Sequence, residues 1–176
     1  LNTFGVKGAL FYAVNDIFLK AALFIIVGLI IYVSGVKYIQ KCGLINKYPL
    51  LGWTYFIVVL SLAGVPPFSG FYGKALIIKG LVANNNTFIA ILVALSGLVV
   101  FYSLIKVFLN VFYDNINKSL ILKPLPKGVQ IPLIAIVAIA LIIGVSSNLL
   151  DGVFDKGIQM VLNPQHYIDL VLKKGA

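Results

Sequence analysis

A lysine placed beside a helix break is the feature of this sequence best suited to chemistry within a membrane. Lys74 lies inside the apolar stretch 49–83 and follows a cluster of helix-breaking residues: Gly64, Pro66, Pro67 and Gly70. Two prolines cannot donate backbone hydrogen bonds and their rings clash with the preceding turn, so the helix must break there. A broken helix at membrane depth requires that the freed backbone line a cavity or be covered by protein. We therefore predict an ion pathway at Lys74, with a proline kink and a lysine that snorkels to the interface as the simpler alternative.

A second set of charges lies in the apolar run 8–33. Asp16 and Lys20 are four residues apart, which places them on one face of a helix. A facing pair lowers the cost of burying either charge but does not remove it. Two interpretations remain open: an internal ion pair that stabilises the helix bundle, or a proton relay in which Lys20 releases and regains its proton as neighbouring charges move.

The composition is that of an integral membrane protein. Hydrophobic residues make up 61% of the 176 residues, against about 45–50% in soluble domains, and the mean hydropathy is +1.05. The net charge of +9 comes from 14 lysines and five aspartates, without arginine or glutamate. Because the lysines concentrate between apolar spans, as in cytoplasmic loops, they argue against a nucleic-acid partner.

No cofactor or metal centre is expected from the sequence. Cys42 is the single cysteine and His166 the single histidine, so together they make no metal-ligand set. The sequence also lacks a phosphate-binding loop and a dinucleotide fingerprint. These observations favour a transporter rather than an enzyme.

Four apolar stretches are long enough to cross a bilayer: about 8–33, 49–83, 87–112 and 129–149. As one helix, the 35 residues of the second stretch would span roughly 50 Å, against a hydrocarbon core of about 30 Å. We therefore predict an all-α membrane protein in which this helix is broken. Residues 1–149 would form the transmembrane bundle, and residues 150–176 an interfacial segment.

The lysine-rich loops predict the topology. Loops 34–47 and 113–127 are both basic, so both are expected to be cytoplasmic. An even number of crossings must separate them, which requires stretch 49–83 to cross once, as two half-helices. The carboxyl terminus then lies outside. Because the chain begins at Leu1 without a signal-peptide pattern, we expect the carboxyl-terminal piece of a longer polypeptide.

Two motifs resemble a known family. Residues 15–28, NDIFLKAALFIIVG, and residues 61–74, SLAGVPPFSGFYGK, are similar to the antiporter-like subunits shared by Mrp-type multisubunit Na⁺/H⁺ antiporters and respiratory NADH:quinone oxidoreductase. Within that family the sequences of the two motifs most closely resemble those of the D subunits of Mrp-type antiporters. The resemblance covers nearly the whole chain and corresponds to roughly the last third of a full subunit.

The resemblance implies a function for the buried charges. Lys20 and Lys74 would belong to a line of protonatable groups in the second of two inverted repeats, in a multi-pass protein of the cell membrane. Asp16 stands where several respiratory relatives carry histidine. Expected partners are other membrane subunits, the lipid bilayer, protons, and Na⁺ or another monovalent cation. A proton-pumping subunit of a redox-driven complex and a non-transporting membrane scaffold are the alternatives.

Overall fold

A computed structural model of the chain describes residues 3–35, 43–113 and 122–145. These residues form helices joined by turns and contain no strand, which confirms the predicted all-α class. The elements are α1 (Thr3–Ser34), α2 (Pro49–Ala63), α3 (Ser69–Ala83), α4 (Thr87–Phe108), the π-helical turn η1 (Leu109–Tyr113) and α5 (Lys127–Val145). The tail 150–176, for which we predicted an interfacial segment, lies outside the described residues.

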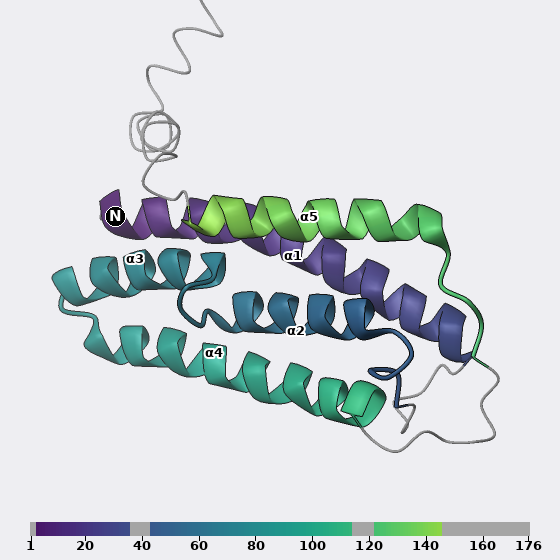
Figure 1. The fold of residues 1–176 in the computed structure, drawn as a ribbon. Coiled ribbons are helices and arrows are strands. Elements are labelled where there is room, and N and C mark those ends of the chain that lie inside the picture. Colours follow the sequence, from purple (N-terminus) through teal and green to yellow (C-terminus); the bar gives the residue numbers. More distant parts are fainter. Residues whose placement is uncertain (1–2, 36–42, 114–121, 146–176) are drawn as a thin grey trace, which may run out of the picture.

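The predicted break is confirmed, and it divides stretch 49–83 into α2 and α3. Each of these helices has 15 residues and is about 22 Å long, less than the thickness of a bilayer core of about 30 Å. Figure 1 shows them end to end beside α1, with α4 on their other side. Together they run the length of α1, as expected for one crossing built from two half-helices.

Glycine and proline end α2 in the manner expected from their backbone preferences. Gly64 adopts a left-handed conformation with φ of 81°, which residues with a Cβ rarely adopt. Its N–H donates to the carbonyls of Leu60 and Ser61, both at 3.2 Å, and the N–H of Val65 donates to Leu60 at 3.1 Å. These bonds cap the helix in the usual C-terminal pattern. The chain then passes through Pro66 and Pro67 before α3 begins.

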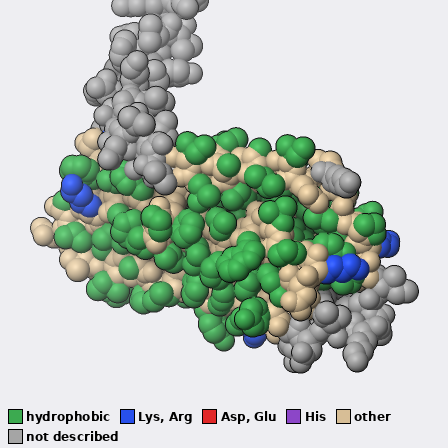
Figure 2. Space-filling model, viewed as in Figure 1, with side chains coloured by type: hydrophobic (Ala, Val, Ile, Leu, Met, Phe, Trp, Pro, Cys, Tyr) green, Lys and Arg blue, Asp and Glu red, His purple; other side chains and the backbone are tan. Residues whose placement is uncertain are grey.

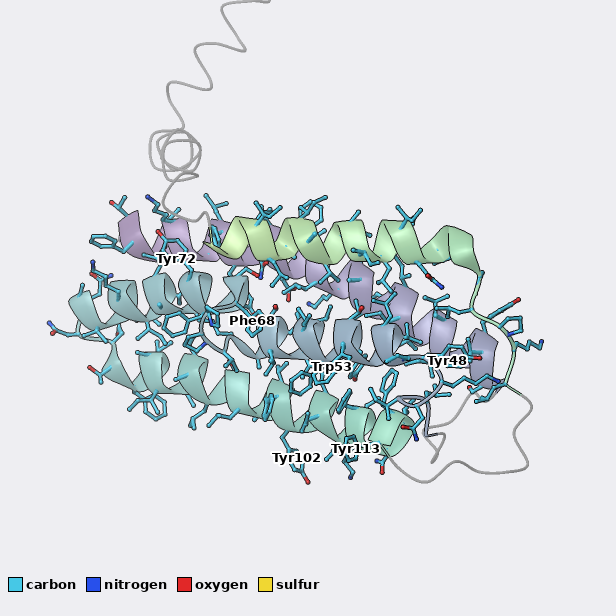
Figure 3. All side chains as sticks on the ribbon, viewed as in Figure 1. Tyr48, Trp53, Phe68, Tyr72, Tyr102 and Tyr113 are labelled. Carbon is cyan, nitrogen blue, oxygen red and sulfur yellow. The ribbon has the colours of Figure 1, made fainter. Side chains whose placement is uncertain are left out.

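The segments around the two basic loops meet at one end of the bundle. The N–H of Leu44 donates to Val111 at 3.2 Å, and the N–H of Lys123 donates to Val33 at 3.0 Å. The Tyr48 hydroxyl also donates to the Lys123 carbonyl at 2.6 Å, and Figure 3 places Tyr48 at this end. The α3–α4 turn lies at the opposite end (Figure 1). The described residues that flank the two basic loops therefore lie at the same end of the bundle.

Two described helical stretches are each long and apolar enough to cross a membrane, Thr3–Ser34 and Thr87–Tyr113. The total of four crossings stays a prediction. The outside of the bundle is apolar as well: Figure 2 shows a face covered mainly by hydrophobic side chains, with lysines near its two ends and at its lower edge. Helix α4 is the most exposed element, and Tyr102 projects outward from it (Figure 3). Such a surface suits lipid or further membrane helices.

Helices α1 and α3 pack closely because glycines lie at their contact. A Cβ on Gly8 would be 2.7 Å from the backbone nitrogen of Ile77, and a Cβ on Gly73 would be 3.0 Å from the Cβ of Tyr12. Small residues let helix backbones approach in membranes, where packing replaces the hydrophobic effect as the source of stability. The helices are antiparallel, and this packing fixes their register next to the break.

Candidate ion-translocation site

Lys74 lies at the break and is buried, as the sequence predicts. Its side chain is only 8% exposed. Its ammonium group donates to the carbonyls of Leu62 at 3.2 Å and Ala63 at 2.8 Å. These carbonyls belong to the last turn of α2, where no later turn supplies a backbone donor. The end of a helix also carries partial negative charge. The lysine of one half-helix therefore donates hydrogen bonds to the end of the other.

Three further residues shape the environment of the ammonium group. The ring of Tyr12 lies 5.7 Å from Lys74 Nζ, within range of a cation–π interaction. A Cβ on Gly64 would be 2.8 Å from Lys74 Cδ, and a Cβ on Gly97 would be 3.0 Å from Lys74 Nζ and 2.6 Å from the Ala63 carbonyl oxygen. Helices α1, α2 and α4 thus all contribute to holding one positive charge.

Gly97 provides a direct test of this geometry. In Gly97→Ala the new methyl group must displace the Ala63 carbonyl or the ammonium of Lys74. Losing one hydrogen bond to a charged group costs about 1.5–3 kcal/mol, which corresponds to a fall in ion exchange of about tenfold or more. Ser96→Ala is the matched control on α4, because Ser96 is exposed and its hydroxyl bonds to Val93 of its own helix. Equal exchange by both variants, measured in the complete complex, would contradict the role of Gly97.

Two cavities reach the end of α2. The first, here the Asp16 cavity, has a volume of about 340 Å³ and is lined by Tyr12, Asp16, Lys20, Leu23, Leu62, Val99, Val100, Ser103 and Leu104. The second, the Lys74 cavity, has a volume of about 510 Å³ and is lined by Ala63, Gly64, Phe71, Lys74, Ala75, Ile78, Lys79, Val82 and Ala94. Leu62 lines one cavity and Ala63 the other. The two carbonyls that hold the ammonium therefore belong to consecutive residues that line different cavities.

Asp16 and Lys20 form the ion pair that their spacing predicts. Lys20 Nζ lies 2.6 Å from Asp16 Oδ2, and the Lys20 side chain is 60% exposed whereas that of Asp16 is 21% exposed. A charge at the surface of an apolar helix has to meet other protein or water. Lys20 thus lies at the surface of this chain, not beside Lys74, and its place in a proton path stays a prediction.

Several residues around the break carry no signal in the sequence. Tyr12 and Gly97 lie in separate helices, and only the packing of these helices brings them to Lys74. Asn15, Ser61 and Ser69 are buried polar residues that lie within the two sequence motifs, although no role is predicted for them from the sequence. Asn15 offers the only hint, since a polar amide next to Asp16 is unusual in an apolar run.

Comparison with known proteins places the chain among membrane antiporter components. The family described as "NADH:quinone oxidoreductase/Mrp antiporter, TM" matches residues 1–100. The chain is 35% identical to the D subunit of a Na⁺/H⁺ antiporter of Bacillus subtilis over 175 residues, which cover 96% of this chain and 35% of that protein. It is 36% identical to "Putative antiporter subunit mnhD2" of Staphylococcus haemolyticus over 180 residues, 99% of this chain and 36% of the relative.

The fold also matches that of a solved structure. A chain of the Mrp complex from Dietzia sp. DQ12-45-1b superposes with a TM-score of 0.89 at 20% sequence identity, covering 98% of this chain and 40% of the other. At that identity the likeness concerns the fold. The present chain spans about a third of the length of the curated relatives that it matches.

Proposed function

Because the chain belongs to the NADH:quinone oxidoreductase/Mrp antiporter transmembrane family, we propose that it forms an ion-translocating part of the D subunit in a multisubunit Na⁺/H⁺ antiporter. The names of its relatives support this choice of subunit, and the match to a chain of an Mrp complex supports other membrane subunits as partners. The protein would reside in the cell membrane, with loops 34–47 and 113–127 on the cytoplasmic side and the carboxyl terminus outside.

The observation that carries this proposal is the buried ammonium of Lys74, which is held by the carbonyls of two consecutive residues that line different cavities. When protonated, Lys74 compensates the carbonyls at the end of α2. When neutral, it loses most of that attraction, and the site becomes ready to accept a proton from the other cavity. Moving one elementary charge across 100 mV is worth about 2.3 kcal/mol, so an ordinary membrane potential can bias these two states.

Asp16 and Lys20 would form the next part of the proton path after Lys74. They line the Asp16 cavity, whose wall includes the Tyr12 ring that faces the Lys74 ammonium. The carboxylate of Asp16 keeps the charge of Lys20 favourable in an apolar stretch. We propose that Lys20, at the surface of the bundle, exchanges protons with groups supplied by the rest of the subunit.

A transport assay on the complete complex tests this function. In everted vesicles that hold a proton gradient, addition of Na⁺ is expected to dissipate the gradient only when the complex is present. A redox-driven pump, which the same family also includes, would instead build the gradient upon NADH oxidation and would not respond to Na⁺. A complex that moves no ions under either condition would favour the scaffold alternative.

A further inference from the structure

Three buried polar atoms near the break lack a partner. Asn15 Oδ1, Ser61 Oγ and Ser69 Oγ make no hydrogen bond within the part of the chain that the structure describes. Their side chains are 1%, 0% and 0% exposed, respectively. Buried polar atoms in native proteins nearly always have a hydrogen-bond partner, and a bound water or ion is one explanation for an orphaned one.

The serine of α2 departs from the pattern of the other hydroxyls. Four described hydroxyls donate to a carbonyl three or four residues earlier in their own helix, at 2.6–2.9 Å: those of Ser34, Thr54, Ser96 and Ser103. Ser61 has twelve helical residues before it in α2, yet it does not make this bond. Its hydroxyl is thus free for a different partner, and so is that of Ser69, the first residue of α3.

Packing brings the backbone segments that carry these atoms close together. Gly70 contacts the Ser61 carbonyl, which sets Ser69 beside the end of α2. On α1, Gly8 lies against Ile77 and Tyr12 lies against Gly73. One more turn in this antiparallel register sets Asn15 opposite the start of α3, where Ser69 lies.

Asn15 and Ser61 are sequence neighbours of residues that line the Asp16 cavity or hold the Lys74 ammonium. Asn15 directly precedes Asp16, and Ser61 directly precedes Leu62; Asp16 and Leu62 both line the Asp16 cavity. Lys74 donates to the carbonyls of the two residues that follow Ser61. Asn15 and Ser61 therefore each precede a residue that lines the Asp16 cavity, and Ser61 also precedes the two residues whose carbonyls hold the ammonium.

We propose that Asn15, Ser61 and Ser69 form a buried site for a water molecule that passes protons between the Asp16 cavity and Lys74. This inference rests on the proposed function of Lys74. An amide oxygen accepts hydrogen bonds and hydroxyls both donate and accept, which matches the bonding of water. A cation is less well matched, because the three oxygens are neutral and the Lys74 ammonium is close by.

The proton transfer leaves the site unchanged. A proton that enters from the Asp16 cavity bonds to the water, and the water releases a different proton through a hydroxyl. That proton bonds to the neutral amine of Lys74, which becomes an ammonium. The water and both hydroxyls regain their composition, and only O–H and N–H bonds form and break.

Removing either hydroxyl tests the site in the complete complex. For Ser61→Ala and Ser69→Ala we expect the maximal rate of exchange to fall by about tenfold or more, since proton relays contribute on this scale. The thermal midpoint should not fall, because these hydroxyls have no protein partner to lose. The KM for Na⁺ should stay unchanged and the solvent deuterium isotope effect should increase. Ser61→Thr, which keeps a hydroxyl, should recover exchange.

The remaining outcomes overturn the water site, and Ser96→Ala serves as the control throughout. Normal exchange in both alanine variants would mean that the hydroxyls carry no protons. A raised KM for Na⁺ at an unchanged maximal rate would mean that the three oxygens hold a cation. A lower thermal midpoint and less assembled complex, in Ser61→Thr as well as in the alanine variants, would mean that these side chains serve only in packing. Failure of the proposed function is seen separately, as normal exchange when Lys74 itself is replaced.

Discussion

Lys74→Ala in the complete complex is expected to reduce Na⁺/H⁺ exchange in everted vesicles to that of vesicles without the complex. The substitution removes a protonatable group that is buried at the break and lines the Lys74 cavity. It also leaves the carbonyls of Leu62 and Ala63 without their donor. The measurement is the dissipation of a proton gradient after addition of Na⁺, with the amount of assembled complex determined on the same membranes.

Two further lysine variants test whether exchange requires a proton that Lys74 can release or only its positive charge. Lys106→Ala is the matched control, because Lys106 is exposed on α4 and lines neither cavity, and it should exchange normally. Lys74→Arg retains a positive charge that can donate to the end of α2, but a guanidinium does not release its proton in proteins. We therefore expect Lys74→Arg to assemble and yet fail to exchange. Undiminished exchange in Lys74→Ala or Lys74→Arg would remove proton transfer by Lys74 from the mechanism.

The helix break and its lysine could be predicted because their signals are local. Proline removes a donor and clashes with the preceding turn wherever it occurs, so Pro66 and Pro67 require a break in any tertiary context. The end of α2 at Ala63 and the start of α3 at Ser69 follow from that chemistry. Loop charge is similarly local, and the cytoplasmic side that it gives both basic loops stays a prediction.

The partners of Lys74 could not be predicted, because they depend on how helices pack. The break frees carbonyls at the end of α2, but only the three-dimensional path of the chain returns Lys74 to Leu62 and Ala63. Gly97 is 23 residues further along the chain, and no periodicity connects it to Lys74. The exposure of Lys20 is equally a property of the packing, since apolar sequence on both sides of it suggests burial.

Gly70→Ala is expected to destabilise the subunit strongly. A Cβ at this position would overlap the carbonyl group of Ser61 and lie 3.4 Å from the Cα of Gly64. Both neighbours are backbone atoms held by the cap at the end of α2, so they cannot rotate away as a side chain can. Overpacking of this kind costs about 1–3 kcal/mol or more. We expect a lower thermal midpoint and less assembled complex, measured by fluorescence-detected chromatography of heated samples.

The control for Gly70→Ala is Gly28→Ala, because a Cβ on Gly28 would have no described atom within 4 Å. In a helix, alanine is ordinarily favoured over glycine by about 1 kcal/mol, so Gly28→Ala should be neutral or stabilising. A loss of stability in Gly70→Ala without a loss in Gly28→Ala would show that the fold requires close approach of the half-helices and not glycine itself. Because Gly70 is one turn before Lys74, any Gly70→Ala complex that survives should also lose exchange. A fully stable and active Gly70→Ala complex would mean that α2 and α3 do not meet as closely as this geometry requires.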